Sequence, residues 1–113
     1  MGRTPEDAQV VRGLVEVFVL HMLAVEDHYA FGMVKDADAR LQIQPPILRR
    51  KTLYPLLHRL QKRGFVTSYA SPGRRGTSRR YYRITRHGRA FLGLRLDDWR
   101  RAARVLKELL AGD

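Results

Sequence analysis

Few folds suit the order in which apolar patterns follow one another along this chain: three helical segments, then two short strands, then a long helix. The third helical segment is the clearest, because its leucines recur at i, i+3, i+4 and i+7 and so share one helix face: Leu53, Leu56, Leu57 and Leu60. Gly64 follows as a typical C-terminal stop. We therefore predict a helix from Ile47 to Arg63.

Two helical patterns precede that segment. The first runs from Pro5 to Ala24, with Thr4 as its expected N-cap. It is apolar around most of its circumference, and such helices are usually buried on more than one side. In so small a chain, this suggests that a partner subunit covers one side. A shorter helix is expected from Tyr29 to about Leu41, before Pro45 and Pro46 break the chain.

Two strand patterns and a long helix complete the chain. Residues 65–69 and 80–84 are rich in aromatic and β-branched side chains, as strands are, with a polar loop at 71–79 between them. Thr85 is expected to cap a final helix that runs to about Leu110. Apolar residues in this helix are spaced 4, 3, 4, 3, 4, the heptad pattern of a helix that packs lengthwise against another: Leu92, Leu96, Trp99, Ala103, Leu106 and Leu110.

This order predicts an α+β fold that is mainly α, a winged helix-turn-helix with a long C-terminal dimerisation helix. We expect a DNA-binding domain over residues 1–84 and the dimerisation helix over residues 85–113. In such folds the helix before the hairpin enters the major groove, while loops and helix ends contact the phosphate backbone. That helix is the predicted segment from Ile47 to Arg63.

The distribution of charge points to a nucleic-acid partner. Between Ala39 and Leu96 the chain has fifteen Lys or Arg residues and no Asp or Glu, although the whole sequence has 22 basic and 11 acidic residues. An ordinary solvated surface would mix both signs, so the missing acids are more telling than the net charge. Because neutralised phosphates release counterions and so drive binding, we expect double-stranded DNA as the partner.

The candidate DNA-binding residues lie on the solvent face of the third helix and in or beside the hairpin loop. On the helix, basic groups are followed by neutral hydrogen-bonding groups one turn later: Arg49, Arg50, Lys51, Thr52, Tyr54, Pro55, His58 and Arg59. The loop adds arginines that can contact phosphates or enter a narrow minor groove: Arg74, Arg75, Arg79 and Arg80. The alternative is that these are ordinary solvated side chains, which suits one residue better than the whole cluster.

Several blocks of this sequence carry a family resemblance. They are Thr52–Leu60 (TLYPLLHRL), Lys62–Val66 (KRGFV) and Arg79–Thr85 (RRYYRIT), with Gly76, Gly88-Arg89, Arg12–Leu14 and Tyr29–Gly32 in support. Together they resemble the PadR family of bacterial transcriptional regulators, over almost the whole chain from about Gln9 to Leu110. The resemblance implies a homodimeric winged helix-turn-helix repressor that dimerises through its last helix, helped by its first.

A single helix after the wing is similar to the smaller PadR subfamily. Some members of that subfamily regulate efflux-pump genes and bind flat, apolar drugs between their subunits. The resemblance therefore implies that Trp99 and its symmetry mate stack on a small aromatic or apolar effector, with Phe18 and Val15 lining the same pocket. Alternatively, Trp99 only fills the dimer interface. The neighbouring Asp97 and Asp98 either favour a cationic ligand or form an ordinary solvated turn of helix.

The helix predicted to enter the major groove, from Ile47 to Arg63, is called the recognition helix here. Its start departs from the family pattern. Family members commonly have a Ser and then a Gly just before the Thr-Leu-Tyr-Pro block, where this chain has Arg49 and Lys51. An Arg side chain cannot accept backbone N–H bonds as a capping Ser does. We expect the cap to move, with Gln44 as the nearest upstream candidate. Because Arg can also read guanine, the operator sequence cannot be carried over from the family.

Enzyme activity has little support in the sequence. It has no Cys, no Ser-His-Asp arrangement and no glycine-rich phosphate loop, so we expect no catalytic residues and no cofactor. We expect no metal site either, because the histidines lack metal-ligand spacing with carboxylates; His21 is expected in or near the core, and His58 to face DNA. The longest uncharged apolar stretch, Val17–Val25, is far shorter than the ~20 residues of a membrane span.

No secretory signal is evident, and the absence of cysteine suits a reducing cytoplasm, where we expect the protein to act. Two alternatives to a sequence-specific regulator remain open. The first is a basic architectural protein that binds nucleic acid without sequence preference. The second is a small-molecule-binding dimer whose DNA role has been lost. The hydrogen-bonding groups of Thr52, Tyr54 and His58 argue against the first, and the intact basic face argues against the second.

Overall fold

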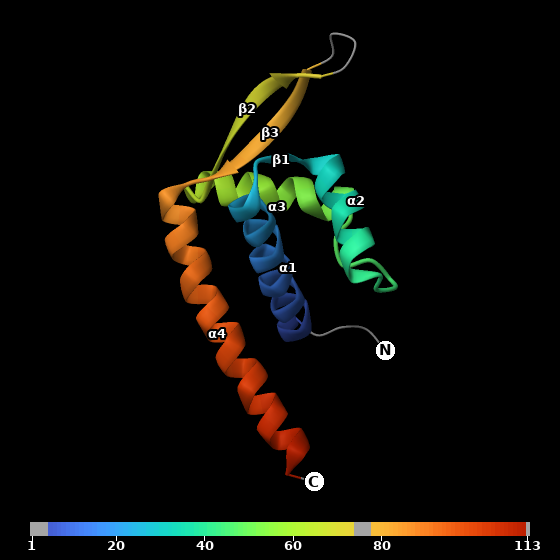
Figure 1. The fold of residues 1–113 in the computed structure, drawn as a ribbon, viewed down its shortest axis with the longest axis vertical. Coiled ribbons are helices and arrows are strands. Elements are labelled where there is room, and N and C mark those ends of the chain that lie inside the picture. Colours follow the sequence, from blue (N-terminus) through green and yellow to red (C-terminus); the bar gives the residue numbers. More distant parts are fainter. Residues whose placement is uncertain (1–4, 74–77, 113) are drawn as a thin grey trace.

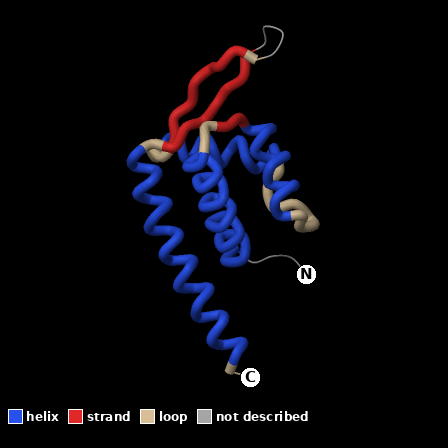
Figure 2. The backbone as a smooth tube through the Cα atoms, in the orientation of Figure 1, coloured by secondary structure: helices blue, strands red, loops and turns tan. Residues whose placement is uncertain are grey.

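The computed structural model describes residues 5–73 and 78–112, with side chains in the first helix from Gln9 on. It is a winged helix-turn-helix with a long C-terminal helix, which confirms the predicted fold class (Figures 1 and 2). In chain order the elements are α1 (Pro5–Val25), β1 (His28–Tyr29), α2 (Ala30–Leu41), α3 (Arg50–Lys62), β2 (Val66–Pro72), β3 (Ser78–Ile84) and α4 (Arg86–Ala111).

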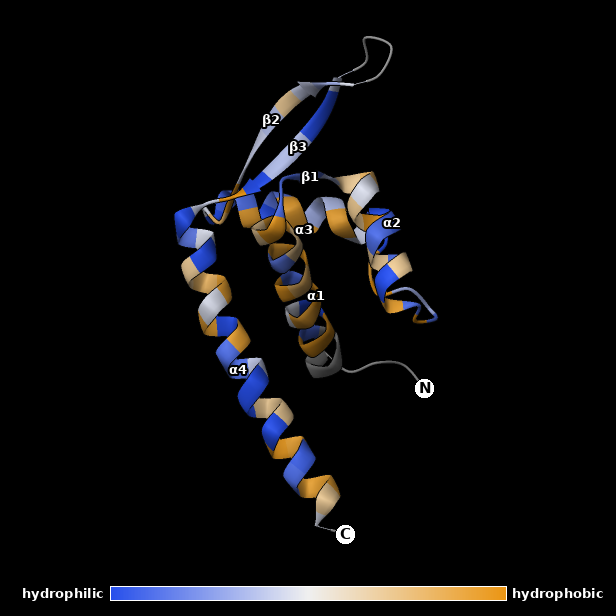
Figure 3. Ribbon diagram, viewed as in Figure 1, coloured by the Kyte–Doolittle hydropathy of each residue, from blue (hydrophilic) through white to orange (hydrophobic). Residues whose placement is uncertain are grey.

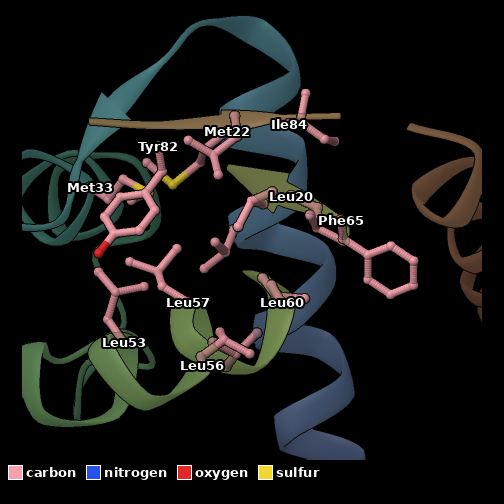
Figure 4. Close-up of a cluster of buried hydrophobic side chains, with 14 of the residues drawn as sticks. Leu20, Met22, Met33, Leu53, Leu56, Leu57, Leu60, Phe65, Tyr82 and Ile84 are labelled. Carbon is pink, nitrogen blue, oxygen red and sulfur yellow. The ribbon is translucent and has the colours of Figure 1, made fainter. Parts of the chain in front are cut away.

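The leucine face of α3 forms the centre of the core. Leu53, Leu56, Leu57 and Leu60 are each at most 2% exposed. Figure 4 shows them gathered with side chains of α1, α2 and β3, among them Leu20, Met33 and Tyr82. Full burial of one leucine side chain contributes roughly 1.5–3 kcal/mol, so this face fixes how α3 sits on the other elements.

The sheet is antiparallel, in the order β1-β3-β2. Both predicted strands form, but they extend into the segment predicted as a loop: Ser71 and Pro72 pair with Arg79 and Ser78. The loop prediction was wrong there because ladder hydrogen bonds join backbone groups, whatever the polarity of the side chains. The strand β1 was missed, and Tyr29 belongs to it rather than to α2. Two residues are too few to show any periodicity.

The recognition helix begins at Arg50, later than the predicted Ile47. Leu48 is only 2% exposed and is buried in the non-helical segment that follows the cis Gln44–Pro45 peptide. The N-cap is Arg49, in an extended conformation, so the expected cap at Gln44 was wrong. Thr52 takes over part of the capping role, because its Oγ1 accepts a bond from Arg49 N at 3.4 Å and donates to Arg49 O at 2.9 Å.

The last helix begins where predicted. Thr85 is its N-cap, and its Oγ1 accepts a hydrogen bond from the backbone of Gly88 at 2.9 Å. The first half of α4 packs against α1, with Leu92 buried and Leu96 and Trp99 partly buried. Leu92, predicted at the dimer interface, thus lies in the core of its own chain. Figure 1 shows α4 running down beside α1.

Apolar side chains remain exposed on α4 and α1. The second half of α4 projects beyond α1, and hydrophobic residues recur along it to its end (Figure 3). Val105, Leu106, Leu109 and Leu110 are 53–75% exposed. On α1, Val10 and Leu14 are exposed on the same side as His21, whose expected place in or near the core was wrong. None of the helices described is long and apolar enough to cross a membrane.

Two glycines of α4 provide a matched test of this packing. A methyl group at Gly88 would overlap the backbone carbonyl of Phe65 and crowd Ile84, whereas Gly93 has nothing within 4 Å. We expect Gly88→Ala to lower the free energy of unfolding by about 1–3 kcal/mol through overpacking. Gly93→Ala should raise it by up to about 1 kcal/mol, because alanine is the better helix former. Urea denaturation at one protein concentration measures both, and equal effects would contradict the close approach of α4 to Phe65.

Candidate nucleic-acid interface

The face of α3 opposite the buried leucines carries most of the predicted DNA-binding residues. Burial of the leucines turns these side chains toward solvent, and all of them are exposed: Arg50, Lys51, Thr52, Tyr54, Pro55, His58 and Arg59. Arg49 is exposed at the N-cap. Thr52 is partly occupied by the helix start, since its hydroxyl proton is donated to the carbonyl of Arg49. Pro55 lies inside the helix, which continues through it to Lys62.

A hollow between the start of α2, α3 and β3 brings the recognition helix and the wing together. Its volume is about 330 Å³, and Tyr54, Arg79 and Arg80 are among the residues that line it. Arg80 donates a hydrogen bond to Ser68 Oγ on the neighbouring strand at 3.0 Å. Two stretches that are 25 residues apart in sequence therefore contribute to one concave, positively charged surface. Arg74 and Arg75 lie outside the described residues.

Two aromatic residues of this hollow were missed by the sequence analysis. Phe31 at the start of α2 is 46% exposed, and the cations of Lys35 and Arg50 lie 5.5 and 5.3 Å from its ring centroid. Arg79 lies 4.5 Å from the ring centroid of Tyr29. Such cation–π contacts restrain long basic side chains in one region of the surface. The Tyr29–Gly32 block, already part of the family resemblance, was the signal that could have identified them.

Asp27, which follows α1, fixes the base of the wing (the hairpin of β2 and β3) to the helices. Its Oδ2 accepts hydrogen bonds from the Tyr69 hydroxyl at 2.6 Å and from Arg83 Nε at 3.0 Å. The bond to Asp27 raises the pKa of the Tyr69 phenol, and loss of solvent adds to this effect. Tyr81 lies between Tyr69 and Tyr29, with ring centroids 5.8 and 5.6 Å away. These contacts hold the hairpin against the helices.

Burial also raises the pKa of Tyr82, whose ring points into the core from β3 (Figure 4). The nearby Tyr54 acts in the same direction, and Arg80 opposes it. Tyr82 therefore stays a neutral phenol beneath the hollow, between the recognition helix and the basic strand. It supports the surface from below and adds no charge to it.

The acidic side chains neutralise other basic residues. Glu16 pairs with Arg63, Asp27 with Arg83, Asp98 with Arg95 and Asp97 with Arg100. Within the part of the chain whose side chains are described, the ion pairs include none of the predicted DNA-binding cations: Arg49, Arg50, Lys51, Arg59, Arg79 and Arg80. The positive charge of this surface is thus uncompensated, as contact with phosphates requires.

The predicted ligand residues lie on different sides of α1. Val15 lines a cavity between α1 and α3. Trp99 lines a separate hollow between α1 and α4, beside Gly13 and Glu16. Phe18 packs against the core. Within one protomer the structure does not bring Val15 and Trp99 into one pocket. Trp99 lies beside Gly13, and residues 13 and 15 of a helix point to different sides. Among the described residues, no group of three or more His, Asp or Glu side chains could hold a metal ion.

Comparison with known proteins agrees with this geometry. The family model described as the transcriptional regulator PadR-like family matches residues 19–94. A solved PadR family transcriptional regulator from Eggerthella lenta is 30% identical, with 94% of this chain and 89% of that chain covered and a TM-score of 0.76. A transcriptional regulator from Clostridium thermocellum is 28% identical, with 88% and 96% covered and a TM-score of 0.77.

Other relatives extend the likeness over nearly the whole chain. A PadR-like transcriptional regulator from Bacillus cereus shares the fold, with a TM-score of 0.81 at 24% identity over 93% of this chain and 99% of that one. An uncharacterized protein from Lysinibacillus sphaericus is 25% identical over 105 residues, which are 93% of this chain and 95% of the relative. Since the family model covers more than half of the sequence, this chain belongs to the PadR-like family of transcriptional regulators.

Proposed function

We propose that this chain is a sequence-specific repressor that binds DNA as a homodimer and is released from it by a small apolar ligand. Membership of the PadR-like family supports the general role in DNA-binding transcriptional regulation rather than catalysis. The observation that carries the specific proposal is the hollow in which Tyr54 of the recognition helix meets Arg79 and Arg80 of the wing. A bacterial repressor of this kind acts in the cytoplasm, where its DNA lies.

In the proposed complex, α3 occupies the major groove. Its 13 residues span about 20 Å at 1.5 Å per residue, and a B-DNA major groove about 12 Å wide admits a helix. Arg49, Arg50 and Lys51 at its start contact bases or phosphates, and Arg59 adds a phosphate contact. Tyr54 and His58 supply neutral hydrogen-bonding groups for base edges, with Thr52 and Pro55 beside them. The wing arginines, including Arg74 and Arg75, contact the backbone or the minor groove.

The exposed apolar residues support the proposed dimer. Residues 1–84 would bind DNA, and residues 85–113 would hold two copies together. The broad apolar side of α4 beyond Trp99, with Ala103, Leu106 and Leu110, would pack against α4 of the partner and against exposed Val10 and Leu14 of its α1. Such a dimer would present two recognition helices to half-sites about one helical turn, or a multiple of it, apart. A small aromatic or apolar effector would bind beside Trp99 at this interface.

Two substitutions test the DNA interface, and a third serves as their control. Fluorescence anisotropy compares the DNA upstream of the protein's own gene with a scrambled fragment of equal length, at near-physiological salt. We expect a preference of about a thousandfold or more for a specific operator. Tyr54→Ala should reduce this preference. Arg80→Ala should weaken binding to both fragments and lower the salt slope by about one, because it removes a phosphate contact.

Arg104→Ala is the matched control for the DNA experiment. It removes the same charge from the polar side of α4, away from the proposed interface, and should leave both affinities nearly unchanged. Variants that all bind like the wild type would contradict the assignment of α3 and the wing. Equal weak binding of the wild type to both fragments would instead favour the non-specific architectural alternative.

A second pair of variants tests the dimer. Leu106→Glu places a charge on the exposed apolar side of α4, where it would be buried in the proposed interface, so we expect dissociation to monomers. Arg104→Glu changes the charge by more, but on the polar side, and should remain dimeric. Sedimentation velocity measures the mass of each, and circular dichroism checks that helices are retained. A Leu106→Glu protein that is as dimeric as the wild type would exclude this side of α4 as the interface.

A further inference from the structure

A cavity between α1 and α3 is lined on one side by apolar residues. Its volume is about 330 Å³, which lies at the lower end of ligand pockets in proteins. Val11 and Val15 line it from α1, Ile47 from the segment before α3, and Leu56 from α3. Leu56 and Val15 are nearly buried, so the apolar wall continues from the core to the surface.

Three cations surround this apolar wall. Arg12 contributes from α1, and Lys51 and Arg59 contribute from α3; among the side chains that the structure describes, no acidic one lines the cavity. In the described part of the chain, none of the ion pairs includes any of these three side chains. Cations at the edge of an apolar cavity suit a ligand with an apolar body and an anionic head, because a charge-assisted hydrogen bond is roughly twice as strong as a neutral one.

We propose that this cavity binds a small amphipathic anion, which has an apolar body and one carboxylate or phosphate head. The apolar body lies against Val11, Val15 and Leu56, and the head pairs with Arg12 and with Lys51 or Arg59. The hollow beside Trp99 is a poorer anion site, because Glu16 and Asp98 line it together with Arg95. The two sites therefore differ in the charge of the ligand that each accepts.

This ligand would compete directly with DNA. Lys51, Thr52, Pro55 and Arg59 line the cavity and also belong to the surface that the proposed function assigns to DNA. An anion bound there pairs with one cation of the recognition helix, Lys51 or Arg59, and occupies space beside it. It would weaken DNA binding by the factor 1 + [L]/Kd without any change of shape. This antagonism rests on the proposed function, whereas binding of the anion does not.

The test uses octanoate and octyl phosphate as anionic probes, with octylammonium and octanol as controls of the same chain length. Calorimetry measures affinity in the absence of DNA, and methyl NMR spectra locate the site. We expect both anions, but neither control, to shift the methyl resonances of Val11, Val15 and Ile47. Arg12→Gln should weaken octanoate binding by about tenfold or more, because it removes a charged hydrogen-bond partner. Arg104→Gln, an equal loss of charge on α4, should bind octanoate like the wild type.

Several outcomes would overturn the proposal. Octylammonium binding as tightly as octanoate would show that the apolar chain alone decides affinity. Unchanged binding by Arg12→Gln, or shifts confined to methyl groups of α4, would place the ligand elsewhere. The head group that binds more tightly, carboxylate or phosphate, identifies the class of natural ligand.

A DNA competition experiment separates this proposal from the proposed function. Wild-type protein that binds octanoate at the cavity but no specific DNA would refute the function and leave the site standing. Protein that binds its operator but no octanoate would refute the anion site and leave the proposed function standing. If both bind, octanoate should raise the apparent Kd for DNA in the wild type and in Arg104→Gln, with a much smaller effect in Arg12→Gln. Simultaneous binding without mutual effect would refute the competition.

Discussion

The candidate DNA-binding face of α3 is held in place by the burial of four leucines on the opposite side of the helix. Their face packs in one core with side chains of α1, α2 and the β2–β3 hairpin, so a shift of any of these elements would disturb it. Because protein interiors are close-packed, the position of these leucines fixes the rotation of α3 about its axis. That rotation decides which side chains point away from the core, and here they are basic or hydrogen-bonding. The buried side of α3 thus stabilises the fold, and its exposed side carries the candidate DNA-binding residues.

Much of this could be predicted from the sequence, because periodic patterns report burial directly. The leucine face of α3, the Thr85 cap and the two main strands all follow from local spacing and residue type. The excess of positive charge could also be predicted without the structure, because residues 39–96 contain no Asp or Glu that could pair with their basic side chains. Acids from outside the window reach only Arg63, Arg83 and Arg95 within it, among the described side chains.

The remaining features depend on contacts between segments distant in sequence. β1 is a strand only because its two residues pair with Tyr81 and Tyr82 of β3. Phe31 reaches the candidate interface because α2 starts beside Arg50 of α3. Likewise, Val15 and Trp99 line hollows on different sides of α1, and the sequence alone does not say that α3 covers one side and α4 the other. Tertiary placement, not local propensity, decided each of these.

The start of α3 carries a consequence for how such a regulator can change over time. Because Thr52 reaches back from inside the helix to the backbone of residue 49, the side chain at position 49 has no capping duty. Position 49 can therefore accept other residues with little loss of stability. The position stands at the tip of the helix that we propose to enter the major groove. In the proposed complex, a substitution at position 49 could thus change the DNA sequence that is recognised while the fold stays the same.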